Sequence, residues 1–454
     1  MGCLTDNTLV PQTDTPSLIH TIILSSISLD KSPRFSLALS GVLASLLGGD
    51  EALSGMATVH VYGDRRWLGW YNTPGSFQIF EQLRSFMKSV SQTHSLSQNV
   101  NTDPATLFNL DAYNGPKFRA AHSGTTIEET GYLATLFTQE CAAWESEGRV
   151  VPGRRTNPVG ITIADLGQAP TPGMRAARTS ASTVFFAGIP ISVSVATCVL
   201  CAAYEDWYGS LSILMGTVAN GVFCSILGSA DFVFTHSVPA KGSPAGDGIL
   251  GSDKDIVLLR GEESTVNAIT RGRYCLRFSS RSHYNLMRWC SFLFLVQSIM
   301  QPLLIPQASL FGQTMFLISL GVSALYNAWL SSMDNEKVHR KFLFEQVFEN
   351  PRLRKYTLGT RTSAGVFALL VLQPQDPTGL MNQLFPNDTK VWRQWKETIL
   401  ERLRQQNDQS FHLGGNVGYL EGFTQEEKDL LAVLYEDAKA AYNGYRDYLQ
   451  ADSP

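Results

Sequence analysis

Residues 289–333 read WCSFLFLVQSIMQPLLIPQASLFGQTMFLISLGVSALYNAWLSSM and contain no charged side chain. The run is about twice the length of roughly 20 residues that one membrane-spanning helix needs. Because Pro302 and Pro306 lie at its middle, we expect two spanning helices, 289–306 and 308–332, joined by a tight turn. Two further charge-free runs, 179–204 and 207–230, are each long enough to cross a bilayer once.

The sequence therefore predicts an α-helical integral membrane protein with four transmembrane helices in two hairpins, plus a mixed α/β cytoplasmic region. The predicted divisions are an N-terminal cytoplasmic region (1–178), a first transmembrane hairpin (179–230), a cytoplasmic loop (231–288), a second transmembrane hairpin (289–333) and a C-terminal cytoplasmic region (334–454). Charged residues are only 17% of the chain and the net charge is -4. No basic field points to nucleic acid as a partner.

The basic residues predict the orientation in the bilayer, because Lys and Arg next to a span favour the cytoplasmic side. Arg175 and Arg178 precede the first span, and five arginines precede the third. The two predicted outer connections, 205–206 and 306–307, contain no basic residue. We therefore expect both chain termini and the central loop to face the cytoplasm, in a membrane that the sequence does not identify.

The regions outside the spans show weaker patterns. Residues 57–62, 159–163 and 255–259 have the character of strands, whereas 76–90, 126–147, 262–273, 334–348, 390–406 and 424–449 have helical spacing. The apolar run 362–373 is too short to cross a bilayer. We expect it to be a buried strand or helix, with a re-entrant or interfacial segment as the alternative. The run 35–47 is likewise too short and is expected to form a core or membrane-surface helix, and 238–252 is expected to form a loop.

Polar residues within the spans are the first candidates for function, since such groups are costly in lipid. Gln297 and Gln301 lie four residues apart on the third span, and Gln313 lies on the fourth. Gln301 and Gln313 are expected at similar depth, where they could hydrogen-bond across the hairpin. One interpretation is that the three glutamines hold the helices together, and the other is that they line a path for a conducted solute or a lipid headgroup.

Small residues on the second span suggest close packing. Ser212 with Gly216, and Gly221 with Ser225, have the four-residue spacing that lets helices approach one another. Packing within the bundle is one interpretation, and assembly of a homo-oligomer is its variant.

Five arginines before the third span form the one charge feature with an expected partner: Arg271, Arg273, Arg277, Arg281 and Arg288. Basic residues at a membrane surface attract anionic lipids at about 1 kcal/mol per charge. The alternative is that these arginines only fix the topology.

No motif in the chain names a cofactor or a metal. The seven cysteines are scattered and form no disulfide framework. Cys198-x-x-Cys201 lies near the outer end of the first span, away from any further expected ligand. The glycines at 246, 248 and 251 match a dinucleotide fingerprint in letters only, because no strand is expected before them. We therefore expect neither a catalytic site nor a cofactor.

Three segments carry a resemblance: STVNAITRGRY (264–274), LLIPQASLFGQTMFLISLGVSALYN (303–327) and RKYTLGTRTSAGVFALLVL (354–372). The second half of the chain resembles a family of multi-pass membrane proteins from mushroom-forming fungi. The resemblance implies a fungal membrane protein with a cytoplasmic loop and tail, and it transfers no activity or site residue.

Three classes of function are consistent with these patterns. The first is a non-enzymatic membrane-anchored scaffold or organiser. The second is an oligomeric channel or transporter, which requires a water-accessible path to the glutamines. The third is a membrane-bound lipid-modifying enzyme, which requires His283 or His339 to have an acidic neighbour. The absence of ionisable residues within the spans favours the scaffold.

Overall fold

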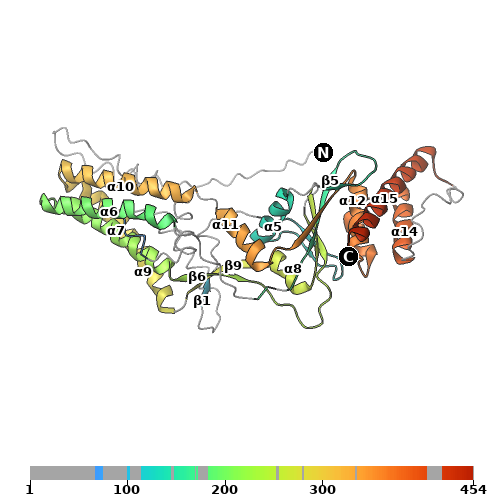
Figure 1. Ribbon diagram of the computed structural model, residues 1–454, viewed down its shortest axis with the longest axis horizontal. Helices are drawn as coiled ribbons and strands as arrows, with labels where there is room; N and C mark the ends of the chain where they lie inside the picture. Colours follow the sequence, from blue (N-terminus) through green and yellow to red (C-terminus); the bar gives the residue numbers. More distant parts are fainter. Residues whose placement is uncertain are drawn as a thin grey trace, which may run out of the picture.

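The computed structural model describes residues 67–74, 100–102, 114–144, 148–168, 170–171, 182–251, 255–278, 281–332, 335–405 and 422–452. Figure 1 shows an elongated molecule, with a bundle of long helices at one end and a sheet covered by helices toward the other. A three-stranded sheet lies between these two parts.

The bundle consists of α6 (Ser182–Ala203), α7 (Trp207–Leu227), α9 (Arg281–Leu304) and α10 (Leu310–Ser331). All four are long and apolar enough to cross a membrane, so the described residues contain four candidate spans at the predicted places. Their outer faces expose apolar side chains to the surroundings. Phe185, Leu310 and Leu325 are each more than 70% exposed. Such faces suit contact with lipid. Helix α9 begins eight residues before the predicted span, because its charged first two turns continue the same helix.

The predicted turn between the last two long helices contains Pro306, whereas Pro302 lies inside α9. Helix α9 ends at Leu304, a 3₁₀ turn covers Ile305–Gln307, and α10 begins at Leu310. Ser309 caps α10, since its hydroxyl oxygen accepts a hydrogen bond from the backbone N–H of Gly312.

The small sheet connects directly to two of the spans. Its strands are β1 (Val100–Thr102), β9 (Arg273–Phe278) and β6 (Ala230–Thr235), in that order and all antiparallel. Strand β6 follows α7 after two residues, and β9 ends two residues before α9. The second and third spans therefore continue into a pair of hydrogen-bonded strands.

The large sheet has seven strands in the order β3-β2-β7-β8-β5-β10-β4. Their bounds are β2 (Phe118–Ala120), β3 (Thr126–Ile127), β4 (Arg149–Val150), β5 (Val159–Asp165), β7 (Gly248–Gly251), β8 (Asp255–Arg260) and β10 (Arg352–Leu358). The pairs β5–β8 and β10–β4 are parallel and the others are antiparallel. Both predicted strands within the described residues, 159–163 and 255–259, are confirmed, whereas β7 lies where a loop was expected.

Helices cover both faces of the large sheet. Helices α5 (Tyr132–Ala143) and α8 (Glu263–Thr270) belong with one face, and α12 (Arg361–Leu372) packs on the other. In β8 the side chains alternate between two apolar cores. Val257 and Leu259 enter the core that includes α5 and α8, and Leu258 enters the core that includes α12. This alternation is the period of two that a strand imposes, and it explains why β8 is apolar at successive positions.

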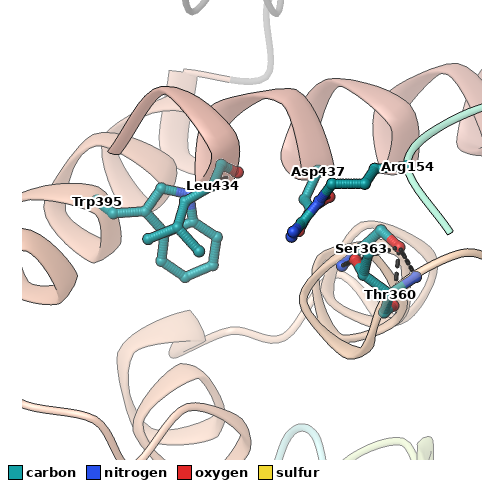
Figure 2. A network of polar contacts seen from close by, with 6 residues as sticks. All are labelled: Arg154, Thr360, Ser363, Trp395, Leu434 and Asp437. Atoms are coloured by element: carbon teal, nitrogen blue, oxygen red, sulfur yellow. Dashed lines mark hydrogen bonds and ion pairs between the residues drawn. The ribbon is translucent and has the colours of Figure 1, made fainter. Parts of the chain in front are cut away.

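The apolar run 362–373 forms helix α12, which is buried between the sheet and the outer helices. These outer helices are α13 (Pro377–Leu384), α14 (Lys390–Gln405) and α15 (Gln425–Asp452). Figure 2 shows polar contacts around α12 and the outer helices. Thr360 and Ser363 form a capping box at the start of α12, Arg154 pairs with Asp437 of α15 at 2.9 Å, and Trp395 Nε1 of α14 donates to the Leu434 carbonyl of α15 at 3.1 Å. The buried-helix prediction for 362–373 is thus confirmed.

The predicted helix 334–348 is present in two parts, α11 (Asn335–Lys341) and a π-helical turn (Phe342–Val347). The predicted segments 35–47, 57–62 and 76–90 lie outside the described residues.

One apolar core runs from the bundle into the large sheet. It contains Phe223 of α7 and Phe294 of α9, continues through Phe232 of β6 and Phe278 of β9, and reaches Leu259 of β8. Because these side chains pack in a single cluster, the bundle and the sheet are joined by buried surface and not only by the chain.

Candidate functional site

A short segment without helical structure lies inside the bundle. We call residues 67–74 (WLGWYNTP) the inserted segment. Tyr71 and Asn72 have no exposed surface, and Thr73 is 5% exposed. From the sequence, this segment was expected in the N-terminal cytoplasmic region 1–178, outside the membrane. The structure packs it among the spanning helices.

All four spans hold the inserted segment through one polar side chain each. Ser194 of α6 accepts from the Asn72 backbone N–H (2.8 Å), Asn220 of α7 donates to the Gly69 carbonyl (2.7 Å), Gln297 of α9 donates to the Thr73 carbonyl (2.6 Å), and Asn327 of α10 accepts from the Tyr71 hydroxyl (2.7 Å). Non-helical backbone at membrane depth requires such partners, since lipid offers none.

Small residues of α7 make room for the inserted segment. A Cβ atom on Gly216 would lie 2.2 Å from Asn72 Oδ1, and one on Gly221 would lie 2.4 Å from the Trp70 ring. Both distances are too short for a real side chain. These glycines were expected to allow close packing of helices, and the structure brings the inserted segment against them.

The three predicted glutamines have different partners. Gln297 binds the inserted segment and is fully buried. Gln301 donates from Nε2 to the carbonyl of Ser212 on α7 at 3.1 Å, and it is 3% exposed. Gln313 donates to the carbonyl of Ala308, just before its own helix. Gln301 therefore bridges α9 and α7, and Gln313 serves the turn.

Asp206 joins the two hairpins at the end of the bundle away from the sheet. Its carboxylate accepts from the backbone N–H of Gly209 (3.0 Å) and from the N–H (2.8 Å) and hydroxyl of Ser309. Burial raises the pKa of this carboxyl, but the hydrogen bonds from Ser309, Gly209 and Gly312 outweigh it and hold the pKa below its ordinary value. One ionised side chain thus serves the first turns of α7 and α10 together.

His339 of α11 is completely buried among aromatic rings. Its Nδ1 atom lies 2.9 Å from the Tyr132 hydroxyl, and its ring stacks on Phe232. Burial lowers the pKa of His339 to about 3, and no carboxylate contributes to the shift. The neighbours of His339 among the described residues include the Tyr132 hydroxyl and the rings of Phe232 and Tyr274, and the side chain of His283 lies outside the described residues.

The five predicted arginines lie along the path from α8 to α9. Arg271 follows α8 and is exposed, Arg273 and Arg277 lie on β9, and Arg281 and Arg288 lie in the first part of α9. Strand β9 alone spans about 17 Å at the usual rise per residue. The side chains of Arg281 and Arg288 lie outside the described residues. The five arginines belong to one stretch of the chain, and the described residues do not show a site that they form together.

Among the described residues, no group of three or more His, Cys, Asp and Glu side chains could hold a metal ion. The described cysteines are all free thiols. Within this part of the chain, polar side chains from all four long helices of the bundle converge on the inserted segment.

Four polar residues of the bundle were not predicted from the sequence as functional candidates: Ser194, Asn220, Asn327 and Asp206. Asn220 and Asn327 had a readable signal, since each is an amide inside a charge-free run. The inserted segment had a weaker one, because Trp67, Trp70 and Tyr71 are unusually apolar for a loop. Comparison of the chain with protein-family models, with curated proteins and with solved structures finds no match to any of them.

Proposed function

We propose that the protein is a non-enzymatic scaffold or organiser, anchored in a membrane by the four-helix bundle and presenting the helix-covered sheet to the cytoplasm. The observation that carries the proposal is the composition of the large sheet. Strand β5 precedes the first span, β7 and β8 lie between the second and third, and β10 follows the fourth. Three separate regions of the chain thus build one body.

The same sheet supports the proposed topology. Strands that pair with one another lie on one side of the bundle, so the N-terminal region, the central loop and the C-terminal region share a side. The basic residues beside the spans favour the cytoplasm for that side.

The alternatives have less support. A channel or transporter needs an open polar path, whereas Gln297 and Gln301 are buried and hydrogen-bonded to the inserted segment and to α7. A lipid-modifying enzyme needs an acid–base pair, and His339 lies among aromatic rings. Anionic lipid contact stays a proposal for Arg281 and Arg288, which are next to the span, and assembly of a homo-oligomer stays a proposal for the exposed apolar faces.

Two measurements test the scaffold. In proteoliposomes, the full chain should give no ion or solute flux above that of empty vesicles under a concentration gradient. In crosslinked membranes, a reproducible set of cytoplasmic proteins should co-purify with it and not with an unrelated four-span protein. Gradient-driven flux, or the absence of any specific partner, contradicts the proposal.

The topology has its own test. A cysteine in place of Glu205, in the turn between α6 and α7, should react from outside with a membrane-impermeant thiol reagent. A cysteine in place of Arg446, on α15, should react only after permeabilisation. Labelling of both from the same side contradicts the proposed arrangement.

A further inference from the structure

Aromatic rings mark both ends of the helix pair α6 and α10. The two helices lie side by side (Figure 1) and run in opposite directions. At the end near the sheets, the ring centroids of Phe186 and Trp329 are 5.1 Å apart, and we call these residues the inner ring pair. At the other end, the centroids of Tyr204 and Phe311 are 4.7 Å apart, and these residues are the outer ring pair. Because each pair joins one helix to the other, the two pairs fix how the helices are aligned along their axes.

The ring pairs face the surroundings of the bundle. Phe186 is 47% exposed, Trp329 is 38% exposed and Tyr204 is 70% exposed. Trp207 extends the outer level, since its ring is exposed as well. Exposed tryptophan and tyrosine rings in membrane proteins gather at the headgroup level on the two sides of a bilayer. The two ring pairs therefore indicate the two interface levels.

Both helices give the same separation between these levels. Phe186 and Tyr204 are 18 positions apart on α6, and Phe311 and Trp329 are 18 positions apart on α10. Tyr204 continues the helix, because its backbone N–H donates to the carbonyl of Leu200. At the rise of an α-helix, 18 positions correspond to about 27 Å. Tilting of the helices would only shorten the projection of this distance on the bilayer normal, so about 27 Å is an upper bound.

The surface between the two levels is free of charge. Residues 187–203 and 312–328 contain no Asp, Glu, Lys or Arg. The exposed side chains of this band include Ile189 and Val199 of α6 and Leu325 of α10. The acidic pair Glu205 and Asp206 comes directly after Tyr204. The apolar band therefore ends where the outer ring pair is, as a lipid-facing surface should.

Bilayers differ in thickness by enough for this band to distinguish them. The hydrocarbon of an endoplasmic reticulum membrane is about 27 Å thick, whereas that of a plasma membrane rich in sterol and sphingolipid is about 32–33 Å thick. A span that is too long can tilt, but one that is too short has to thin the bilayer around it, which costs free energy for each ångström. In the thicker membrane α6 and α10 would be too short by about 5–6 Å.

We propose that the bundle resides in a fluid, sterol-poor phospholipid bilayer with hydrocarbon about 27 Å thick, the thickness of an endoplasmic reticulum membrane. The exposed faces of α6 and α10 between the ring pairs are the surface that contacts this lipid. The inference rests on the proposed anchoring in a membrane and adds the class of membrane to it.

The first test measures the thermal unfolding midpoint of the full chain in phosphatidylcholine vesicles of increasing acyl chain length, which cover hydrocarbon thicknesses from about 22 to about 35 Å. The midpoint should be highest near about 27 Å and several degrees lower at about 33 Å. A maximum at the thicker end, or no dependence on thickness, overturns the assigned thickness and leaves the anchoring intact. Failure of the chain to insert into vesicles of any thickness contradicts the anchoring itself.

Matched variants test the role of the rings. Tyr204→Leu combined with Trp207→Leu removes exposed rings from the outer level, so the midpoint should depend less steeply on thickness. Phe223→Leu changes a ring that has no exposed surface. This control should lower the midpoint by a similar amount in every bilayer and leave the thickness of the maximum unchanged. The same profile in the double variant and in the wild type contradicts the assignment of the outer level.

A further measurement uses only the wild-type chain. In a structure determined in nanodiscs of a lipid with hydrocarbon about 33 Å thick, the bilayer density should be thinner beside α6 and α10 than at the edge of the disc. In nanodiscs of a lipid with hydrocarbon about 27 Å thick, the density should have one thickness throughout. Uniform density in the thick nanodisc, with thickening beside the bundle in the thin one, overturns the proposal.

Discussion

Individual polar side chains in the bundle have defined tasks, and their chemistry predicts how each responds to change. Asn220 and Gln297 act as donors to backbone carbonyls, and Asp206 acts as an ionised acceptor for two helix starts. His339 differs, because its imidazole is buried in its neutral form.

The buried imidazole predicts an acid-sensitive fold. The unfolded chain binds a proton at His339 below about pH 6.5, whereas the folded pKa is about 3. Between these values the unfolded state holds more protons, so the free energy of unfolding falls as the pH falls, by up to about 1.4 kcal/mol per pH unit. His339→Phe should remove this part of the slope between pH 7 and 5. Denaturant unfolding in detergent measures it.

The matched control for this experiment is Tyr132→Phe, which removes the hydroxyl next to Nδ1 and leaves the imidazole buried. Its slope should equal that of the wild type. An unchanged slope in His339→Phe contradicts the assignment.

Asp206 predicts a local effect of charge. Asp206→Ala removes the acceptor for Gly209 and Ser309, so the free energy of unfolding should fall by about 2 kcal/mol or more. Glu205→Ala, at the neighbouring position with an exposed side chain, should change it by less than about 0.5 kcal/mol. Equal effects of the two variants would show that the carboxylate does not join the hairpins.

At the scale of elements, the inserted segment is held in the bundle by side chains of the four helices, which bond mainly to its backbone groups. Asn220 and Gln297 hold opposite ends of the same short piece of chain, at Gly69 and Thr73. If the whole segment detaches from the helices in one step, the loss of either hydrogen bond also weakens the other hydrogen bond.

This coupling can be measured in a double-mutant cycle. Asn220→Leu and Gln297→Leu should each cost about 1–3 kcal/mol, because each removes a hydrogen bond to a buried backbone carbonyl. The double variant should cost less than the sum by about 0.5 kcal/mol or more. Asn220→Leu combined with Gln313→Leu serves as the control and should be additive. Additivity in both pairs would mean that the segment is held by independent contacts.

The elements also show what could be predicted from the sequence. Long charge-free runs and prolines predict α6, α7, α9, α10 and their turns, because lipid imposes one length and one composition. Strands β5 and β8 followed from apolar runs. Strand β7 was missed because Gly248 and Gly251 weaken its pattern. The burial of the inserted segment was not predicted, because its polar partners lie on four other helices. Its own sequence therefore has neither a helical nor a strand period.

At the scale of the whole molecule, the two antiparallel strands β6 and β9 carry the connection between the bundle and the large sheet. Spans two and three run into them directly, and the apolar core passes through them. The register of this pair therefore decides how the bundle is oriented with respect to the sheet.

The register predicts a specific crosslink. Val233 stands opposite Cys275, and opposed residues in antiparallel strands have Cα atoms about 4.5–5.5 Å apart, within the range of a disulfide. Val233→Cys should form a disulfide with Cys275 on mild oxidation. After cleavage at a protease site introduced at the exposed Lys241, the two fragments should migrate together until reduced. Phe234→Cys, on the opposite face of the strand, should not crosslink.

The position of β10 has a consequence for biosynthesis. This strand lies in the interior of the large sheet, between β5 and β4, yet it is made only after both hairpins. Until then β5 has an open edge, which is a template for pairing with other chains. A ribosome that stops before residue 352 thus releases a chain that has its four long apolar helices but an unfinished sheet, a product that quality-control proteases and chaperones must recognise by the open edge of β5.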